Sequence, residues 1–311
     1  MKQALIRVAY LACAILCAVL VYQTLLREQS IAQTQQRFRP VQAWPQLPQG
    51  WTLGAVSGVA ISKDGNILVF NRGEHPLIKV KPDGKFVRSF GEGAVTTAHG
   101  LRVDAENNVW TTDVGNHTVT KYAPDGKVLM VLGEKDKAGD DATHFNKPAD
   151  VAFAGDGSFF VADGYGNSRV AKFDRDGKFI KAWGTKGTGP GEFNLVHALA
   201  LDSKGLLYVA DRENNRVQIF DQDGKFIRMW THLGAPFGFF MTPDDRLYIT
   251  DGRAHKVTVV NRAGKVLHTF GSPGTGPGEF QLPHDIAVSP TGDIYVGEIT
   301  NKRIQKFQSS K

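Results

Sequence analysis

Apolar and polar positions alternate in short runs along residues 50–308, as in Arg216-Val-Gln-Ile-Phe and Phe226-Ile-Arg-Met-Trp. Alternation with a period of two residues is typical of half-buried β-strands. No segment of this stretch shows the sustained 3.6-residue period of an amphipathic helix. The hydrophobic pattern therefore predicts an all-β domain.

A hairpin turn of the Asp-Gly-Lys type recurs between these runs. Asp-Gly favours a tight hairpin because its glycine adopts a positive φ at no steric cost. The turn glycines are Gly84, Gly126, Gly177, Gly224 and Gly264, so successive turns are 42, 51, 47 and 40 residues apart. A period of roughly 40–50 residues that holds about four short strands is typical of a β-propeller blade. The repeat predicts a six-bladed β-propeller over residues 41–308.

The last repeat offers three strands, His284–Ser289, Ile294–Glu298 and Arg303–Phe307, and lacks an outer one. An open sheet edge favours aggregation, so a fourth strand is needed from elsewhere. The stretch Val41–Leu53 precedes the first repeat and is the expected donor. We therefore predict that an N-terminal strand closes the ring.

Residues 8–22 are almost wholly apolar and follow Lys2 and Arg7. A charged start followed by an apolar run is typical of a signal peptide or an uncleaved signal anchor. We assign residues 1–26 to this segment, as a transmembrane helix if it is retained, and residues 27–40 to a polar linker. The propeller is then expected outside the cytoplasm, on the periplasmic or extracellular face, either membrane-anchored or secreted.

Cysteine and charge narrow the chemistry of the predicted propeller. The two cysteines, Cys13 and Cys17, both lie in the apolar segment, so the ring has neither disulfides nor thiolate ligands. The net charge of +6 is spread over turn lysines rather than gathered in a stripe with aromatic residues. Nucleic acid is therefore not an expected partner.

Three histidines, His99, His197 and His284, occupy the same repeat position in units two, four and six. In a closed ring they would converge on the axis with near three-fold symmetry. Three imidazoles on one face are a ligand set that holds a catalytic zinc ion with one position open. The alternative is structural: each histidine would cap a strand start and bond to neighbouring backbone.

Further candidates lie on the loops after the second strands of their repeats. Tyr165, between two glycines, could lean over the axis and act as a base, since a nearby metal favours the phenolate. Arg72 suits a carboxylate substrate, or else forms a surface ion pair. Arg212 either orients Tyr165 or pins neighbouring blades. Asp285, directly after the third histidine, could help to bind a second, hard cation together with backbone carbonyls.

Several segments spread along residues 56–307 resemble a known family. They are Val56-Ser-Gly-Val-Ala, Asn71-Arg-Gly-Glu-His, His99-Gly-Leu, His144-Phe-Asn-Lys-Pro-Ala-Asp-Val-Ala, Asp163-Gly-Tyr-Gly-Asn-Ser-Arg, His197-Ala-Leu-Ala-Leu, Ala210-Asp-Arg-Glu-Asn-Asn-Arg and Leu282-Pro-His-Asp-Ile. The sequence resembles the NHL-repeat propellers and, more narrowly, the peptidyl-α-hydroxyglycine α-amidating lyase family. Asp-Gly-Tyr and Pro-His-Asp-Ile are its more specific motifs.

The resemblance implies roles for the residues that match the family's motifs. His99, His197 and His284 would bind zinc, Tyr165 would be the base, and Arg72 would hold the substrate. A structural calcium ion would be held by the Asp285 side chain and the backbone oxygens of Val59 and Leu101. The implied reaction cleaves the N–C bond of a carbinolamide to give an amide and glyoxylate. The substrate would be a peptide, or a small molecule, with a C-terminal α-hydroxyglycine-like group.

The sequence also departs from the family. Asn146 and Gly166 stand where the family has a disulfide. No copper monooxygenase segment accompanies the propeller, so a separate monooxygenase is a candidate partner. Two other functions stay open: a non-catalytic NHL propeller that binds a protein or glycan at the cell envelope, and a hydrolase such as a lactonase. A calcium lactonase would need carboxylates and asparagines at the axis, and the only acidic residue that the pattern places there is Asp285.

Overall fold

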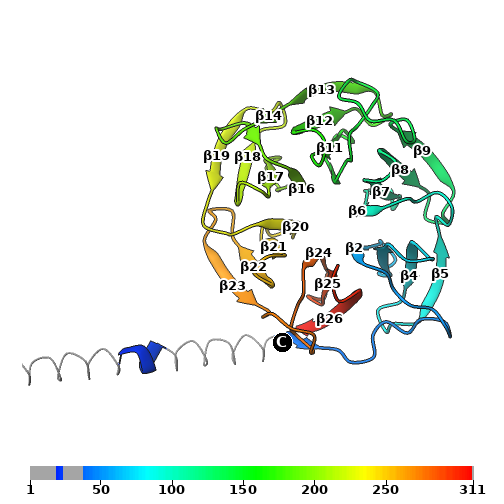
Figure 1. Ribbon diagram of the computed structural model, residues 1–311, viewed down its shortest axis with the longest axis vertical. Helices are drawn as coiled ribbons and strands as arrows, with labels where there is room; N and C mark the ends of the chain where they lie inside the picture. The colour runs from blue at the N-terminus through cyan, green and yellow to red at the C-terminus, as the bar shows by residue number, and fades with distance from the viewer. Residues whose placement is uncertain (1–18, 24–37, 310–311) are drawn as a thin grey trace, which may run out of the picture.

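Six four-stranded antiparallel sheets stand around a common axis in the computed structural model, which describes residues 19–23 and 38–309 (Figure 1). The sheets follow one another in chain order, and each begins with the strand nearest the axis. This arrangement confirms the six-bladed β-propeller that the turn spacing predicts.

The strands fall into four rings. The inner strands are β2 (Val56–Ile61), β6 (Ala98–Val103), β10 (Asp150–Phe153), β16 (Val196–Leu201), β20 (Pro236–Met241) and β24 (Pro283–Val288). The second strands are β3 (Ile67–Asn71), β7 (Val109–Asp113), β11 (Phe159–Asp163), β17 (Leu207–Asp211), β21 (Leu247–Asp251) and β25 (Ile294–Glu298). The third strands are β4 (Leu77–Val80), β8 (Thr118–Tyr122), β12 (Arg169–Phe173), β18 (Arg216–Phe220), β22 (Lys256–Val260) and β26 (Arg303–Ser309). The outer strands are β5 (Phe86–Phe90), β9 (Val128–Leu132), β13 (Phe179–Trp183), β19 (Phe226–Trp230), β23 (Val266–Phe270) and β1 (Phe38–Pro40). A short parallel pair, β14 (Thr185–Lys186) and β15 (Glu192–Phe193), leads into blade four.

The hydrophobic core lies between the blades. Each of six clusters of buried side chains joins two neighbouring blades, as where Phe160 of blade three meets Leu199 of blade four. The second strand of every blade is buried along its whole length because it has a neighbouring blade on both faces. Burying one large apolar side chain stabilises the fold by about 1.5–3 kcal/mol, so the stacked blades stabilise one another.

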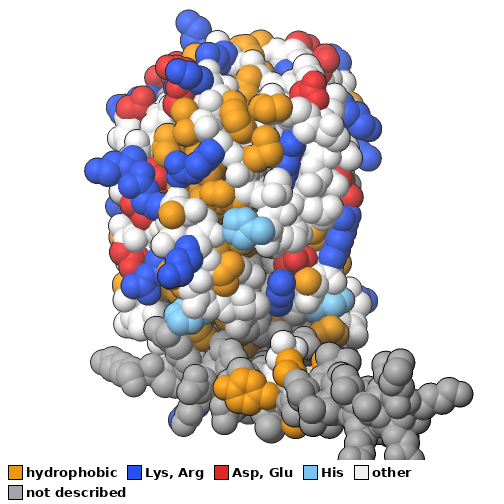
Figure 2. Space-filling view, turned by 90° about the vertical axis from the view of Figure 1, so that its left-hand side faces the viewer, with side chains coloured by type: hydrophobic (Ala, Val, Ile, Leu, Met, Phe, Trp, Pro, Cys, Tyr) orange, Lys and Arg blue, Asp and Glu red, His pale blue; other side chains and the backbone are white. Residues whose placement is uncertain are grey.

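The outer strands are mostly half-buried or exposed, and they do not show the strict alternation of buried and exposed positions that the sequence pattern predicts. Ile227 of β19 and Val266 of β23 are among their exposed apolar residues. Figure 2 shows this flank of the ring, where apolar side chains lie along the middle and charged side chains of both signs lie toward the edges. The mixed charges keep the exposed edge strands from pairing with other sheets.

The turn glycines have positive φ, and each also makes a close contact. Gly224 has a φ of 81°, and a Cβ at this position would lie 2.6 Å from the ring of Trp183. Gly264 packs in the same way against Trp230. In these blades the turn thus rests on an aromatic residue of the preceding blade's outer strand, whereas Gly177 rests on Met130, and only glycine allows both the turn and this approach.

An N-terminal strand closes the ring, but not the one that we expected. β1 pairs antiparallel with β26, with Phe38 opposite Ser309 and Pro40 opposite Phe307. The closing strand therefore comes from residues assigned to the linker, and the expectation that Val41–Leu53 forms it is wrong. That stretch contains Pro45 and Pro48, which lack the backbone N–H that a strand needs.

The stretch after β1 still fills the junction between blades six and one. The ring of Trp44 lies 5.1 Å from that of Tyr295, and its Nε1 donates to the carbonyl of Pro82. A Cβ on Gly84 would meet Trp44, just as the other turn glycines meet the outer strand of the preceding blade. Trp44 thus takes the place of the missing outer-strand aromatic residue.

A fragment that begins at residue 41 is expected to be less stable than one that begins at residue 38. The longer fragment keeps β1 and the buried Phe38, whose ring lies 5.0 Å from Phe270. Loss of a buried Phe side chain costs about 3–5 kcal/mol, or about 6–20 °C in melting temperature for a domain of this size. Thermal denaturation of both fragments measures the difference. Equal melting temperatures would mean that β1 does not stabilise the closure.

The predicted signal or anchor segment lies largely outside the described residues. Within it, residues 19–23 form a short helical segment. Over residues 19–23 and 38–309, the structure contains no helix with the length and apolar character needed to span a bilayer. Membrane attachment therefore stays a prediction.

Candidate active site

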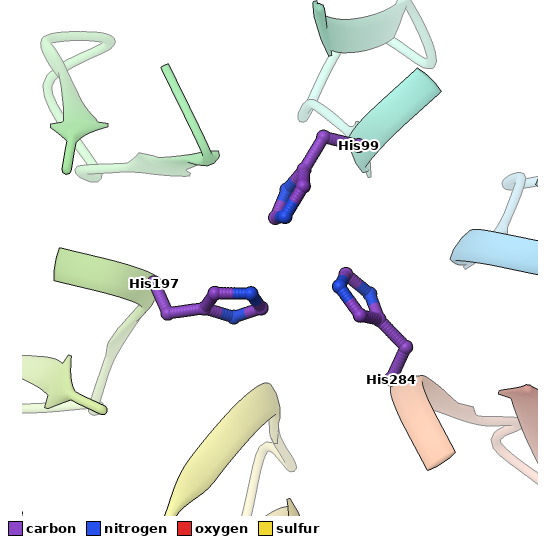
Figure 3. Close-up of side chains that lie close together, drawn as sticks. All are labelled: His99, His197 and His284. Atoms are coloured by element: carbon purple, nitrogen blue, oxygen red, sulfur yellow. The ribbon is translucent and has the colours of Figure 1, made fainter. Parts of the chain in front are cut away.

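The three predicted histidines meet at the axis of the ring. They lie on the inner strands β6, β16 and β24, and their rings point toward one another (Figure 3). The ring centroids are 4.8, 4.8 and 4.9 Å apart, and one nitrogen from each lies within 4.8 Å of the others. All three side chains are buried. The repeat register alone thus brought together residues that lie up to 185 positions apart in the sequence.

Each histidine is held by the backbone of the next blade. Nδ1 of His99, His197 and His284 lies 2.7, 2.6 and 2.7 Å from the carbonyl oxygens of Ala149, Phe237 and Ser57 respectively. A carbonyl only accepts, so Nδ1 carries the proton and the lone pair is on Nε2. Each imidazole can therefore bond to the backbone through Nδ1 and bind a metal ion through Nε2 at the same time.

The backbone around His99 is shaped to make this contact. A Cβ on Gly100 would lie 2.4 Å from the carbonyl oxygen of Ala149, so only glycine lets the two inner strands approach. Thr112 supports the same carbonyl, since its hydroxyl donates to Ala149 O at 2.8 Å and accepts the N–H of Gly100 at 2.8 Å. The imidazole is thereby fixed from two sides.

The histidines are neutral at physiological pH. Burial lowers the pKa of His99 and His197 well below the usual value for histidine, and it lowers the pKa of His284 to about 3. The positive charge of Arg212 acts in the same direction on all three. Neutral imidazoles with fixed Nε2 lone pairs are the form that binds a transition metal.

The donor set suits zinc. Three neutral imidazole nitrogens converge without thiolates, and three protein ligands leave room for a further ligand. Imidazole also binds copper, iron and nickel. The three histidines therefore identify a metal site, but they do not by themselves select the metal.

Tyr165 stands directly over the histidines. It lies on the loop after β11, and its hydroxyl is 3.1 Å from Nε2 of His99 and 3.0 Å from Nε2 of His197. Gly164 makes this position reachable, since a Cβ there would lie 1.9 Å from the carbonyl oxygen of Val196. The sequence prediction that Tyr165 leans over the axis agrees with this placement.

Arg212 orients Tyr165, which was one of its two predicted roles. Its Nη1 donates to the Tyr165 hydroxyl at 3.1 Å, and its guanidinium lies 4.7 Å from the ring centroid of Phe237. Glu213 fixes the other side of the guanidinium, with Oε1 2.9 Å from Nε. Glu213 in turn pairs with Arg253. A half-buried arginine held on three sides keeps the phenol beside the histidines.

Arg72 lies at the mouth of the same site. Its Nε donates to the carbonyl of Ala98, the residue before His99, at 3.0 Å. Among the described residues, no other side-chain nitrogen of Arg72 forms a hydrogen bond, and the side chain is exposed. The outer edge of its guanidinium is therefore available to an anionic ligand that approaches the histidines.

Phe237 is a part of the site that the sequence pattern did not single out. Its ring lies 5.2 Å from that of His197 and 6.0 Å from that of His284, and it forms an apolar wall beside them. It occupies in blade five the repeat position that holds histidine in blades two, four and six. The repeat register therefore places Phe237 at the axis, but an apolar residue carries no chemical signal of a functional site.

The calcium site implied by the resemblance does not fit this chain. Of the expected ligands, Val59 donates its backbone N–H to Asp285 Oδ2 at 2.9 Å. The Arg102 side chain lies on the other two expected ligands: Nη1 is 3.0 Å from Oδ2 of Asp285 and 2.9 Å from the carbonyl oxygen of Leu101. A guanidinium already occupies the place that the metal would need.

Family models match two parts of the ring. A model described as a 6-bladed beta-propeller matches residues 140–229, and the NHL repeat model matches residues 96–122 and 280–307. Among solved structures, a streptogramin B lyase has a TM-score of 0.65 at 16% identity, over 89% of this chain and 99% of that one. At this identity the likeness concerns the fold alone.

Curated relatives are closer in sequence. Peptidyl-glycine alpha-amidating monooxygenase B of Xenopus laevis is 33% identical over 86% of this chain and 35% of its own length. Peptidyl-alpha-hydroxyglycine alpha-amidating lyase 1 of Drosophila melanogaster is 33% identical over 85% of this chain and 58% of its own length. The chain thus spans about a third of the amidating monooxygenase and over half of the amidating lyase.

Proposed function

The chain belongs to the NHL-repeat β-propellers and is homologous to the peptidyl-α-hydroxyglycine α-amidating lyases, and from this premise we propose that it is a zinc-dependent carbon–nitrogen lyase. The proposed reaction cleaves a carbinolamide to an amide and glyoxylate. The observation that carries the proposal is the Tyr165 hydroxyl, which lies 3.1 and 3.0 Å from two of the three convergent imidazole nitrogens. A candidate base therefore lies directly beside a candidate metal site.

The three Nε2 atoms would hold the metal ion. A bound zinc ion would supply a Lewis acid that polarises an oxygen of the substrate. The histidines lie at the axis, beneath the loops of several blades. The residues on those loops would therefore contact the substrate.

Arg72, Tyr165 and Arg212 would carry the remaining parts of the reaction. Arg72 would bind the carboxylate of the α-hydroxyglycine with its outward-facing guanidinium. Tyr165 would accept the proton of the substrate hydroxyl, and Arg212 would keep the phenol oxygen in place. As the hydroxyl loses its proton, the C–O bond becomes a double bond and the C–N bond breaks. The departing amide nitrogen takes up one proton, so the reaction balances without a further reactant.

The relatives also suggest where the substrate originates. The monooxygenase relative is longer than this chain, which matches 35% of it. We propose a peptide with a C-terminal α-hydroxyglycine-like group as the substrate and a separate monooxygenase as its source. We further propose that the propeller works outside the cytoplasm, attached through its N-terminal segment or secreted.

The direct test is glyoxylate release from a peptidyl α-hydroxyglycine by the full chain, with metal content determined on the same sample. Glyoxylate release that stops on chelation and returns with zinc supports the proposal. Bound zinc without glyoxylate release contradicts the proposed reaction but not the metal site. Neither zinc nor turnover would favour an NHL propeller that binds a protein or glycan.

Replacing Arg72 by glutamine is expected to raise KM while kcat changes little, because the guanidinium binds a part of the substrate that does not react. A hydrogen bond to a charged group contributes about 1.5–3 kcal/mol, which corresponds to about 10- to 150-fold in KM. Steady-state kinetics on the free acid and on its methyl ester measure the effect. The ester should be insensitive to the substitution, and so should the acid when Arg88, on the outer strand β5, is changed instead.

A further inference from the structure

A second polar layer lies in the axial channel next to the histidines. It consists of Arg102 on β6, Asp150 on β10 and Asp285 on β24, which line one cavity together with the three histidines. The Asp150 and Asp285 side chains are only 3% and 5% exposed, and that of Arg102 is 18% exposed. Charges buried to this degree are stable only when each has a partner.

The Arg102 guanidinium bridges this layer. Nη2 lies 2.7 Å from Oδ2 of Asp150 and 3.4 Å from the carbonyl oxygen of Phe239. Nη1 lies 3.0 and 3.2 Å from the two oxygens of Asp285 and 2.9 Å from the carbonyl oxygen of Leu101. One side chain from blade two thus bonds to oxygens of blades two, three, five and six.

The carboxylates are also fixed from behind. Asp150 accepts the N–H groups of Leu199 and Val151 at 3.0 and 2.8 Å, and Asp285 accepts the N–H of Val59 at 2.9 Å. The Arg102 guanidinium bonds to oxygens of the same two carboxylates. The result is a cage of carboxylate and carbonyl oxygens, which is the environment that a calcium ion prefers.

The repeat shows that the arginine is specific to one blade. The corresponding positions of the other five inner strands hold apolar residues, which are Ala60, Ala152, Ala200, Phe240 and Ala287. Asp150 and Asp285 share the position that precedes this one by two residues, in blades three and six. The sequence therefore combines two inward carboxylates with a single long cationic side chain that reaches both.

We propose that the Arg102 guanidinium takes the place of a calcium ion at the axis of this propeller. It supplies the positive charge of the oxygen cage from within the chain and joins four blades there. The stability of the ring then does not depend on calcium. This inference is independent of the proposed lyase activity, because it concerns only the layer beside the histidines.

The first experiment is thermal denaturation of the full chain with excess EGTA and with excess calcium chloride, together with calorimetric titration of calcium. We expect the same melting temperature in both solutions and no calcium binding. A melting temperature that falls in EGTA would overturn the proposal. So would calcium binding that disappears in the Asp285→Asn variant. This experiment decides the question even if the variants below do not fold.

The second experiment removes the internal cation. Arg102→Ala leaves two buried carboxylates without a partner, so the melting temperature should fall by about 6–20 °C. Calcium should restore much of the loss, and titration should now show binding that Arg102→Ala/Asp285→Asn lacks. Arg169→Ala is the matched control, because it unpairs the buried Asp163 away from the axis. It should lose stability without any response to calcium, and a calcium response absent from both variants would contradict the proposal.

Discussion

Replacing His197 by alanine is expected to abolish metal binding and glyoxylate release together. His197 supplies one of three convergent nitrogens, and with two imidazoles the site loses the ligand count of a catalytic zinc centre. A metal that polarises a substrate oxygen contributes several kcal/mol to transition-state stabilisation, so the rate should fall by about 10³-fold or more. Metal analysis and the glyoxylate assay on the purified variant measure both losses.

Two controls separate this result from a loss of folding. Exogenous zinc should not restore the rate of His197→Ala, whereas it should restore that of chelated wild type. His268→Ala changes a histidine on the outer strand β23 and should keep both metal and activity. A His197→Ala variant that still releases glyoxylate at the wild-type rate would show that the three-histidine centre is not the site of the reaction.

Replacing Tyr165 by phenylalanine is expected to lower kcat by about 10²–10⁴-fold while the metal stays bound. The substitution removes only the hydroxyl, which lies beside Nε2 of His99 and His197 and accepts a hydrogen bond from Arg212. The ring keeps its packing, so the fold and the ligand set should be unchanged. Kinetics and metal content on the same preparation distinguish a base from a metal ligand.

Tyr122→Phe is the matched control for this substitution. Tyr122 is buried in blade two, where its ring lies 5.6 Å from that of Phe90, away from the axis. It should leave kcat unchanged. If Tyr165→Phe retained full kcat, another group would have to accept the proton of the substrate hydroxyl. If it lost the metal, Tyr165 would act as a ligand rather than as a base.

Arg212 contacts Tyr165 and acts at the same site as the two substitutions above. Its guanidinium contacts the Tyr165 hydroxyl and lies between Phe237 and Glu213, so it acts through the phenol. The sequence left open whether Arg212 orients Tyr165 or pins the blades. The answer depended on which way a long side chain turns, and local sequence does not specify this.

The sequence by itself determined the blades and the register of the histidines. Turn chemistry at Gly84 and its equivalents is local, and alternation along a strand specifies which residues face inward. Since every blade starts at the same repeat position, residues in equivalent slots must face the same axis. His99, His197 and His284 could therefore be brought together without any knowledge of their contacts.

Only the tertiary structure decided how the ring closes and which cation lies on its axis. β1 was found at residues 38–40 because the competing stretch contains prolines and packs Trp44 against blade one instead. The expected calcium ligands meet the Arg102 guanidinium because two carboxylates on distant strands and one arginine converge there. Such a choice depends on the distance between groups far apart in the chain, which a local pattern does not contain.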